Sequence, residues 1–289
     1  MRAKGDFHLH STHSDGRRTP AELAAIAHRN GLRVIALTDH DTVNGLSEMR
    51  AALRAYPEIT LVPGVELSTD LPGTEVHILG YWVDEHDPQF QAALARFREG
   101  RVGRGRAMVN KLTALGFPLS WERVQEIAGD ASIGRPHIAQ AMVEAGYVAS
   151  TDEAFDRFLG RNGPAYVERE KLSPAEAIKL IRDAGGVPVV AHPTYIANME
   201  QEVAALVPHG LMGMEVYYRR YTPEQIAALR ALADRLGLFP LGGSDYHAME
   251  REEETEPGDI PLPDEVVDAF MALGRGRPGY EPLRGQGRP

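Results

Sequence analysis

The segment RVIALTDHDT, residues 33–42, joins an apolar run to a cluster of polar residues. Residues 33–38 predict a short buried strand, because a strand that is covered on both faces is apolar along most of its length. Asp39, His40 and Asp41 follow at the C-terminal end of this strand. In barrels of alternating strands and helices, functional side chains gather at that end of the strands. The segment therefore predicts an α/β fold, with His40 as a candidate site residue.

Capped helices separate this strand from others like it. Three segments place Ser or Thr before Pro, and then Glu or Gln three positions after the cap, which is typical of a capping box at a helix N-terminus. These segments begin at Thr19, Ser173 and Thr222. Further apolar strands are predicted at residues 60–65, 76–83, 187–191, 213–217 and 239–242. Strands that alternate with helices predict a parallel sheet, and their number favours closure into a barrel.

The middle of the chain has helical periodicity, and we predict no strand between residues 90 and 161. A long helix is expected over residues 87–115, with interruptions near Gly100, Gly103 and Gly105, because glycine weakens helix interiors. Shorter helices are expected at residues 121–128, 136–145 and 151–159. We therefore predict a helical insertion domain (90–161) inside a discontinuous barrel domain (1–89 and 162–273), followed by a flexible tail (274–289).

The composition narrows the chemistry. The chain contains no cysteine, so a metal ion would be bound by His, Asp and Glu, which suits zinc, manganese, iron or magnesium. The formal net charge of −10 favours small substrates and argues against binding of long duplex nucleic acid. The acidic run at residues 250–256 predicts a solvated loop. Without a signal-peptide pattern or an apolar run of about 18–20 residues, we expect a cytoplasmic protein without a membrane partner, and the sequence gives no indication of an oligomeric state.

Metal-compatible side chains occur in five further segments, most of them at or near predicted strand ends. These residues are His8 with His10, Glu66, His77, His192, and Asp245 with His247. His8 and His10 are two positions apart, so on a strand both imidazoles would face the same side. Glu66 could bridge two metal ions, which a neutral imidazole does poorly. Each segment also has an ordinary structural explanation, and it is their joint pattern that predicts a metal site.

Basic residues are concentrated at the start of the predicted insertion. They are Arg96, Arg98, Arg101, Arg104, Arg106 and Lys111, with Glu99 as the acidic residue among them. Six cations and one anion give a local charge of +5 in a chain whose formal charge is −10. This cluster could guide an anionic substrate, or it could form a solvated helix face.

Taken together, the motifs resemble those of the PHP (polymerase and histidinol phosphatase) phosphoesterases. The matching segments are His8-Leu9-His10 with Asp15, Thr38-Asp39-His40, Gly64-Val65-Glu66, His77, Ala191-His192-Pro193 and Gly243-Ser244-Asp245-Tyr246-His247. The resemblance extends from about residue 6 to residue 247. It implies a distorted seven-stranded α/β barrel of PHP type with a trinuclear metal site.

The resemblance also implies how the ligands divide among two or three divalent metal ions. His8, His10, Glu66 and Asp245 would bind one ion, and Glu66 would bridge to a second ion that His77 and His192 also bind. Asp15, His40 and His247 would bind the third. Some members of the family carry a histidine where this chain has Asp15, and that difference could alter which metal occupies the third position.

A segment of the predicted insertion, Gly134-Arg135-Pro136-His137, resembles one found in the nucleotide-directed branch of the family. Members of that branch hydrolyse nucleoside 3′,5′-bisphosphates or trim short 5′-phosphorylated RNA from its 5′ end. The resemblance implies that Arg135 and His137 bind a substrate phosphate, and the planar fork of an arginine matches phosphate oxygens. The alternative is that Pro136 only begins a helix and that Arg135 is solvated.

The implied reaction is metal-dependent hydrolysis of a phosphate ester, with Glu66, His192 and His247 as the catalytic candidates. Clustered metal ions lower the pKa of a bound water and neutralise charge on the phosphoryl group. Three alternatives stay open. The chain could be a metabolite phosphatase, such as a histidinol phosphatase. It could be an amidohydrolase-like C–N hydrolase, although that class usually needs a bridging modified lysine, or it could be a metal-binding module without catalysis.

Overall fold

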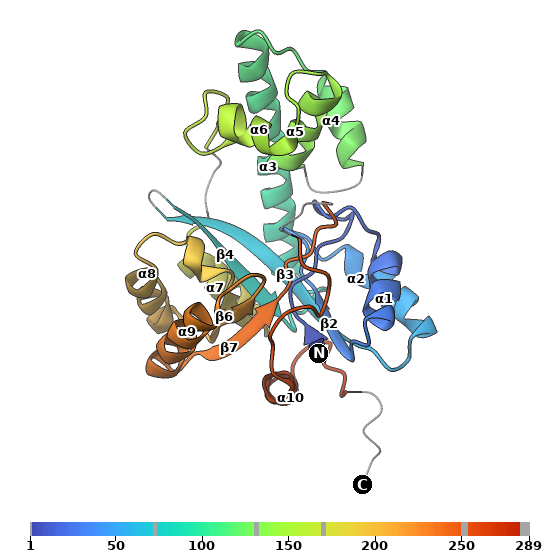
Figure 1. The fold of residues 1–289 in the computed structure, drawn as a ribbon, viewed down its shortest axis with the longest axis vertical. Coiled ribbons are helices and arrows are strands. Elements are labelled where there is room, and N and C mark those ends of the chain that lie inside the picture. The colour runs from blue at the N-terminus through green and yellow to red at the C-terminus, as the bar shows by residue number, and fades with distance from the viewer. Residues whose placement is uncertain (1, 72–73, 130–132, 169–171, 250–253, 284–289) are drawn as a thin grey trace.

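The computed structural model describes residues 2–71, 74–129, 133–168, 172–249 and 254–283. Seven strands form one sheet in the order β1 to β7, and the sheet curves into a nearly closed barrel (Figure 1). The strands are β1 (Gly5–Asp6), β2 (Val34–Leu37), β3 (Thr60–Leu71), β4 (Thr74–Tyr81), β5 (Val187–Val190), β6 (Gly213–Tyr218) and β7 (Phe239–Gly243). The predicted fold class, a distorted seven-stranded α/β barrel, is confirmed.

The prediction of a parallel sheet is wrong for one strand. β4 runs antiparallel to both of its neighbours, β3 and β5, whereas the other pairs are parallel. β3 ends at Leu71 and β4 begins at Thr74, a separation too short for the crossover of a dozen or more residues that parallel neighbours need. β3 is also six residues longer than its predicted end at Val65 and forms a long hairpin with β4.

The segment that contains His8 and His10 differs from the prediction in one respect. β1 ends at Asp6, so the two histidines follow the strand rather than lie on it. Leu9 nevertheless pairs on both sides, because its carbonyl accepts the N–H of Thr38 at 2.9 Å and it forms a parallel bridge with Tyr246. The extended backbone therefore still directs both imidazoles to one side, as the alternation of residues requires.

The barrel closes where the segment after β1 meets the segment after β7. We call this junction, residues 6–10 and 244–246, the seam. The backbone N–H of His10 donates to the carbonyl of Tyr246 at 3.0 Å. The buried carboxylate of Asp6 accepts three backbone N–H groups, from His8 at 3.2 Å, Ser244 at 3.0 Å and Gly258 at 2.9 Å. Asp6 therefore links both sides of the seam.

Replacing Asp6 with alanine is expected to lower the free energy of unfolding by about 2–3 kcal/mol, because three buried N–H groups lose their acceptor. Chemical denaturation followed by circular dichroism measures the change. The control is Asp268→Ala, since the exposed Asp268 pairs only with Lys4 at the surface and should contribute less than about 0.5 kcal/mol. Equal stabilities of the two variants would contradict the assigned role of Asp6.

Helices and short helical turns pack around the barrel. They are α1 (Pro20–Arg29), α2 (Gly45–Ala52), η1 (Leu53–Ala55), α7 (Pro174–Asp183), η3 (Pro193–Tyr195), α8 (Met199–Leu206), η4 (Val207–His209), α9 (Pro223–Leu236) and α10 (Asp264–Leu273). The predicted capping boxes at Thr19, Ser173 and Thr222 are all formed. α10 buries Phe270 among the rings of Phe7 and Trp82, with centroids 5.0 and 4.6 Å away.

A second group of helices stands beyond one end of the barrel (Figure 1). They are α3 (Pro88–Ala114), α4 (Trp121–Ala128), α5 (Arg135–Glu144), α6 (Thr151–Ala154) and the π-helical turn η2 (Phe155–Leu159). These helices have a hydrophobic cluster of their own, separate from the cluster of the barrel. We call the part of the chain from residue 101 to residue 167 the helical segment.

α3 is continuous, so the predicted interruptions at its glycines are wrong. Its N-terminal half buries Phe90 and Leu94 in the barrel cluster, and its C-terminal half buries Met108 and Leu112 in the other cluster. Tertiary packing at both ends outweighs the helix propensity of glycine, which costs only about 1 kcal/mol per residue. Gly105 also lies against the ring of Trp121, where there is little room for a side chain.

Within the described ranges, no helix is both long and apolar enough to cross a membrane. The acidic run at residues 250–256 is described only from Glu254 onward, so most of the predicted loop lies outside the described residues. In the predicted tail, residues 274–283 lie against the barrel: the Arg277 guanidinium donates to the carbonyl of Gly185 at 2.8 Å, and the Thr60 hydroxyl donates to the carbonyl of Pro282 at 3.2 Å.

Candidate metal centre

The nine sequence-predicted ligands converge at one end of the barrel. His8, His10 and Asp15 follow β1, His40 follows β2, Glu66 and His77 lie on β3 and β4, His192 follows β5, and Asp245 and His247 follow β7. The backbone holds the β2 and β3 residues in register beyond the end of β2, because the N–H of Glu66 donates to the carbonyl of Asp39 at 3.2 Å. We call this group of nine side chains the cluster.

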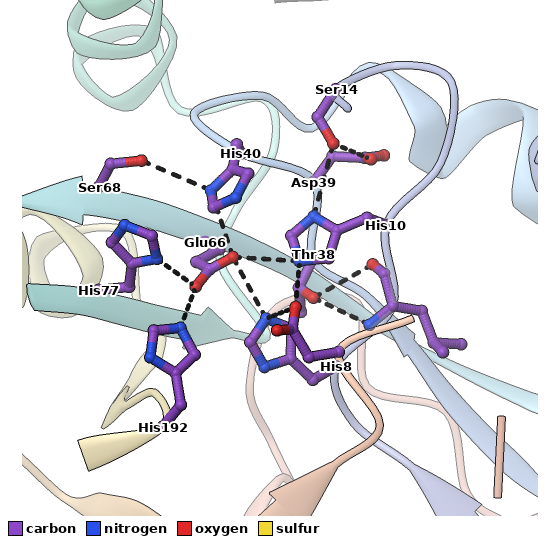
Figure 2. A network of polar contacts seen from close by, with 12 residues as sticks. His8, His10, Ser14, Thr38, Asp39, His40, Glu66, Ser68, His77 and His192 are labelled. Atoms are coloured by element: carbon purple, nitrogen blue, oxygen red, sulfur yellow. Dashed lines mark hydrogen bonds and ion pairs between the residues drawn. The ribbon is translucent and has the colours of Figure 1, made fainter. Parts of the chain in front are cut away.

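Glu66 lies at the middle of the cluster, and its carboxylate contacts five imidazoles (Figure 2). Oε2 is 3.2 Å from His8 Nε2, 3.1 Å from His10 Nε2 and 3.2 Å from His40 Nδ1, and Oε1 is 2.8 Å from His77 Nδ1 and 3.3 Å from His192 Nε2. The Glu66 side chain is only 1% exposed. One buried carboxylate therefore faces two sets of nitrogen donors, one on each oxygen.

Two further carboxylates occupy the side of the cluster near the seam. Asp245 Oδ1 lies 3.3 Å from His8 Nε2 and 3.2 Å from His10 Nε2. Asp15 Oδ1 lies 3.3 Å from His247 Nε2, and Asp15 Oδ2 lies 3.8 Å from His40 Nε2. Imidazoles and carboxylates thus alternate through the cluster, which is the arrangement expected where several cations share ligands.

The donor atoms form three overlapping groups. Within each group, all donor atoms lie within 4.8 Å of one another. The groups are His8, His10, Glu66 and Asp245; His10, Asp15, His40 and His247; and His40, Glu66 and His77. The first group has the composition that the resemblance implied for one metal ion. The second adds His10 to the expected set, and the third contains His40 where His192 was expected, although His192 also contacts Glu66.

The residues present fit a set of divalent ions. Among the described residues, three buried atoms of the cluster lie 3.1–3.6 Å from an imidazole or carboxylate but without the geometry of a hydrogen bond: His10 Nε2, Asp15 Oδ1 and His77 Nε2. A buried polar atom without a partner costs about 1–3 kcal/mol, so such atoms are rare unless a ligand satisfies them. Imidazole nitrogens and carboxylate oxygens, without thiolates, suit zinc, manganese, iron or magnesium.

The pKa values of the histidines in the cluster reflect their burial and their close contacts with carboxylates. Burial lowers the pKa of His10, but the carboxylates of Asp245 and Glu66 outweigh it and raise the pKa of His10 to about 9. A similar balance with Glu66 raises the pKa of His77 to about 10. At His40 burial prevails and lowers the pKa to about 3. Protons and metal ions therefore compete for several of these nitrogens.

The backbone adopts unusual conformations at the cluster. His192 and Asp245 have positive φ angles of 28° and 52°, which non-glycine residues rarely adopt. Such positions concentrate at functional sites, where the surrounding structure holds the strain. Gly243 has no room for a side chain, because a Cβ there would overlap the Cβ of His8. The last strand can therefore approach the first closely enough to place Asp245 beside His8.

Glu215 is a residue of the site that the sequence analysis did not identify. Its carboxylate is fully buried on β6. Oε1 lies 3.0 Å from His8 Nδ1, and Oε2 accepts the backbone N–H of His192 at 2.6 Å. The available signal was a single acidic residue within an apolar strand, since burial of a lone carboxylate is costly unless it has partners.

Asp39 and Asp41 support the cluster from outside it. Asp39 accepts hydrogen bonds from the N–H and the hydroxyl of Ser11 and from the hydroxyl of Ser14, each at 2.7 Å, and so fixes the loop after β1. Asp41 accepts the N–H of Ser68 at 3.0 Å. Carboxylates around a metal site often position the ligands in this way.

Arg101 connects the helical segment to the cluster. From α3 it donates to Asp41 and to the hydroxyl of Ser68, both at 2.7 Å, and Ser68 Oγ lies 3.4 Å from His40 Nδ1 (Figure 2). Two other members of the predicted basic cluster donate to backbone carbonyls, Arg104 to Val167 and Lys111 to Tyr166. Arg101 therefore connects the helical segment to the barrel, and Arg104 and Lys111 stabilise the helical segment internally.

Arg135 and His137 lie at the start of α5, facing the barrel end. Arg135 forms an ion pair with Glu75 at 2.8 Å, and its guanidinium lies over the ring of Phe155 at 5.5 Å. His137 is nearly buried, and its Nδ1 accepts the N–H of Gly134 at 3.0 Å. Arg135 therefore has a protein partner already, and a phosphate there would have to share it with Glu75.

Two adjoining pockets lie between the barrel end and the helical segment. The first has a volume of about 340 Å³ and is lined by Asp15 and His137 among others. The second has a volume of about 330 Å³ and is lined by Asp15 and His247. Pro136 and Phe155 border both pockets. The cluster therefore opens directly into a space between the two parts of the molecule.

A barrel that carries buried imidazoles and carboxylates beside pockets, at the end where its parallel strands finish, belongs to the class of metal-dependent hydrolases. Comparison with known proteins gives the family. The PHP domain family matches residues 6–171. The chain belongs to the PHP family, and it is a phosphoric ester hydrolase, as the resemblance in its motifs implied.

The relatives cover most of the chain. A 5′-3′ exoribonuclease of Haemophilus influenzae is 34% identical over 251 residues, which is 86% of this chain and 91% of the relative. A 3′,5′-nucleoside bisphosphate phosphatase of Chromobacterium violaceum is 34% identical over 248 residues, 84% of this chain and 87% of the relative. A crystal structure from Bifidobacterium adolescentis, of a protein assigned as a metal-dependent phosphoesterase, superposes with a TM-score of 0.84 at 30% identity and covers 95% of this chain and 99% of the other.

Proposed function

We propose that the protein hydrolyses the phosphate monoesters of nucleoside 3′,5′-bisphosphates, or trims short 5′-phosphorylated RNA by cleaving its phosphodiester bonds, or does both. The observation that carries the proposal is the Glu66-centred cluster, which opens into pockets bordered by Pro136 and His137. A phosphate bound at the cluster would thus lie next to the start of α5. The names of the Haemophilus influenzae and Chromobacterium violaceum relatives support nucleotide substrates.

We propose that the nine side chains of the cluster bind two or three divalent ions, with manganese, zinc, iron and magnesium as the candidates. Glu66, which faces imidazoles on both oxygens, would be the shared ligand. When bound, such ions supply a water of lowered pKa and neutralise charge on the phosphoryl oxygens. The protein's own contribution is to hold the nitrogen and oxygen donor atoms in fixed positions.

The remaining proposed roles belong to His137 and His247, which line the pockets, and to Arg135 and His192. Burial lowers the pKa of His137, so its imidazole is neutral near pH 7. Its Nδ1 accepts the N–H of Gly134, which leaves the proton on Nε2, where a phosphate oxygen would compete for it with the backbone of Ser14. Arg135 would bind the same phosphate through its fork of donors. His192 and His247 are the candidates for moving a proton to the leaving oxygen.

The first experiment is to measure phosphate release from adenosine 3′,5′-bisphosphate with added manganese, in parallel with nucleotide release from a short 5′-phosphorylated RNA. A chelator-treated sample and the His192→Ala variant are the controls. We expect metal-dependent turnover that both controls lack, and the better substrate distinguishes the two forms of the proposal. Absence of turnover with protein shown to carry metal would reject nucleotide substrates and favour a metabolite phosphate, such as histidinol phosphate, or a metal-binding module.

Replacing Arg135 with alanine is expected to raise KM for adenosine 3′,5′-bisphosphate about 10- to 100-fold, because a charge-assisted contact to phosphate contributes about 1.5–3 kcal/mol. Arg135→Lys should recover only part of this loss, since a lysine cannot make the planar two-point contact. Steady-state kinetics measures both variants. Arg123→Ala is the matched control, because Arg123 pairs with Glu144 and Glu126 on the exposed surface of α4. An unchanged KM for Arg135→Ala would contradict the role.

A further inference from the structure

An aromatic side chain is exposed at the mouth of the cluster. Tyr195 is 66% exposed, more than Leu115 at 44% or Val102 at 38%, the other exposed large hydrophobic residues of the described chain. Tyr195 also lines the second pocket together with His247. An aromatic ring at the wall of a pocket offers a flat face on which a ring of the ligand can stack, and an aromatic side chain gains most when it is covered.

The position of Tyr195 is fixed by its neighbours. It ends the 3₁₀ turn η3 (Pro193–Tyr195), and its N–H donates to the carbonyl of His192 at 3.2 Å. The next residue back, Thr194, donates its hydroxyl to Tyr221 at 2.8 Å. The Tyr195 ring centroid lies 5.6 Å from that of His192 and 6.3 Å from that of Tyr218. The ring is therefore held by a short anchored turn directly beside the cluster.

The rest of the second pocket has apolar and charged lining. Phe155 and Met249 are apolar, and Phe155 is held beneath the guanidinium of Arg135. Arg219 and Arg220 are cationic, Asp15, Asp152 and Glu254 are acidic, and Arg219 binds Asp245 at 3.1 Å. The apolar and aromatic walls suit a flat ring system, and charged groups of both signs suit the hydroxyl and amino groups of a nucleoside. A volume of about 330 Å³ is at the small end of the range for ligand pockets and fits one nucleoside.

We infer that Tyr195 is the platform on which the base of the substrate stacks, and that the second pocket holds the nucleoside whose phosphate lies at the cluster. The inference rests on the proposed function and adds to it the residue that recognises the base. Stacking on an aromatic side chain contributes about 1–3 kcal/mol per base and tolerates every base, because each has a π-face. Tyr195 thus gives preference for nucleotides over simple phosphate esters without selecting one base.

The kinetic test compares two substrates that differ only in the base, adenosine 3′,5′-bisphosphate and ribose 3′,5′-bisphosphate. Tyr195→Ala should lower kcat/KM for the nucleotide about 5- to 150-fold and leave kcat/KM for the ribose compound close to that of the wild type. Tyr195→Phe keeps the ring and should retain the wild-type kcat/KM for both substrates. If Tyr195→Ala hydrolyses the nucleotide as well as the wild type does, the stacking inference is overturned while the proposed function stands.

A binding test makes the inference independent of turnover. The native tryptophans, Trp82 and Trp121, are buried, so a Tyr195→Trp variant places a new indole in the second pocket. Adenosine 5′-monophosphate should quench its fluorescence by stacking, whereas ribose 5-phosphate should not. Leu115→Trp is the control, because Leu115 is exposed at the C-terminal end of α3, away from both pockets.

The two tests separate the possible failures. If the wild type hydrolyses no nucleotide, the proposed function fails, and the fluorescence of Tyr195→Trp alone decides the base platform. Quenching by the nucleotide that is saturable and absent in Leu115→Trp supports the platform. Unchanged fluorescence of Tyr195→Trp at millimolar nucleotide overturns it, whatever the turnover.

Discussion

Replacing Glu66 with glutamine is expected to lower kcat/KM for nucleotide hydrolysis by at least about 1000-fold, the loss of roughly 4 kcal/mol of transition-state stabilisation. The substitution keeps the shape of the side chain and removes its charge. Both Glu66 oxygens face imidazole nitrogens at 2.8–3.3 Å, and an amide presents an N–H₂ group to one of the two sets. That group can neither bind a cation nor neutralise it, so the proposed shared ligand of the cluster would be lost.

Metal content measured by mass spectrometry should fall together with activity in Glu66→Gln. The matched control is Glu58→Gln, because Glu58 also contacts a histidine, His28 at 2.6 Å, on the surface of the barrel. This control should keep the metal content and the kcat/KM of the wild type. A Glu66→Gln protein with full metal content and normal turnover would show that the proposed bridging ligand is not needed and would require a different assignment of the cluster.

Replacing Glu215 with leucine is expected to lower the free energy of unfolding by about 3–5 kcal/mol, because removing one member of a buried pair leaves its partners uncompensated. The partners are the ring of His8 and the backbone N–H of His192. Glu215→Gln retains an acceptor for the N–H, so it should fold with a smaller loss. Thermal unfolding measures the difference between the two variants.

Glu215→Gln is also expected to weaken metal binding by about 10- to 100-fold. A carboxylate that accepts a proton from Nδ1 of His8 leaves Nε2 free to face the cluster, and an amide fixes this tautomer less strongly. Because Glu215 acts through His8 and not on the substrate, added metal should restore kcat in this variant. Glu224→Gln, on the exposed start of α9, is the control. A kcat that stays low at saturating metal would mean that Glu215 takes part in the chemistry itself.

Several of the candidate ligands could be predicted from the sequence because they follow strand ends, whereas Asp15 was identified only through the resemblance in the motifs. An apolar run followed by a histidine or a carboxylate, as at His40 and His192, indicates both the presence of a strand and the residue at which it ends. Barrel closure then brings such ends together without any further information. The same argument finds Glu66, whose strand carries the apolar residues before it.

Other features depend on information that a local pattern does not contain. The apolar residues of β4 predict a strand but not the direction in which it runs. Its antiparallel pairing with β3 follows from the short connection after Leu71. Glu215 has no surrounding motif, and its role depends on β6 lying next to β5 and β7. The contact of Arg101 with Asp41 requires the path of α3 across the barrel end, which no residue pattern in α3 specifies.

The seam determines when the enzyme becomes complete during its synthesis. His8 and His10 emerge from the ribosome first, and their partners Asp245 and His247 emerge more than 230 residues later. Contacts of such long sequence separation form late, since a large loop has to close before they are made. A nascent chain, or a fragment that ends before Asp245, lacks one side of the seam. It also lacks Asp245 and His247, which belong to two of the three groups of donor atoms. We therefore expect translation to yield an inactive intermediate until the last strand has been made.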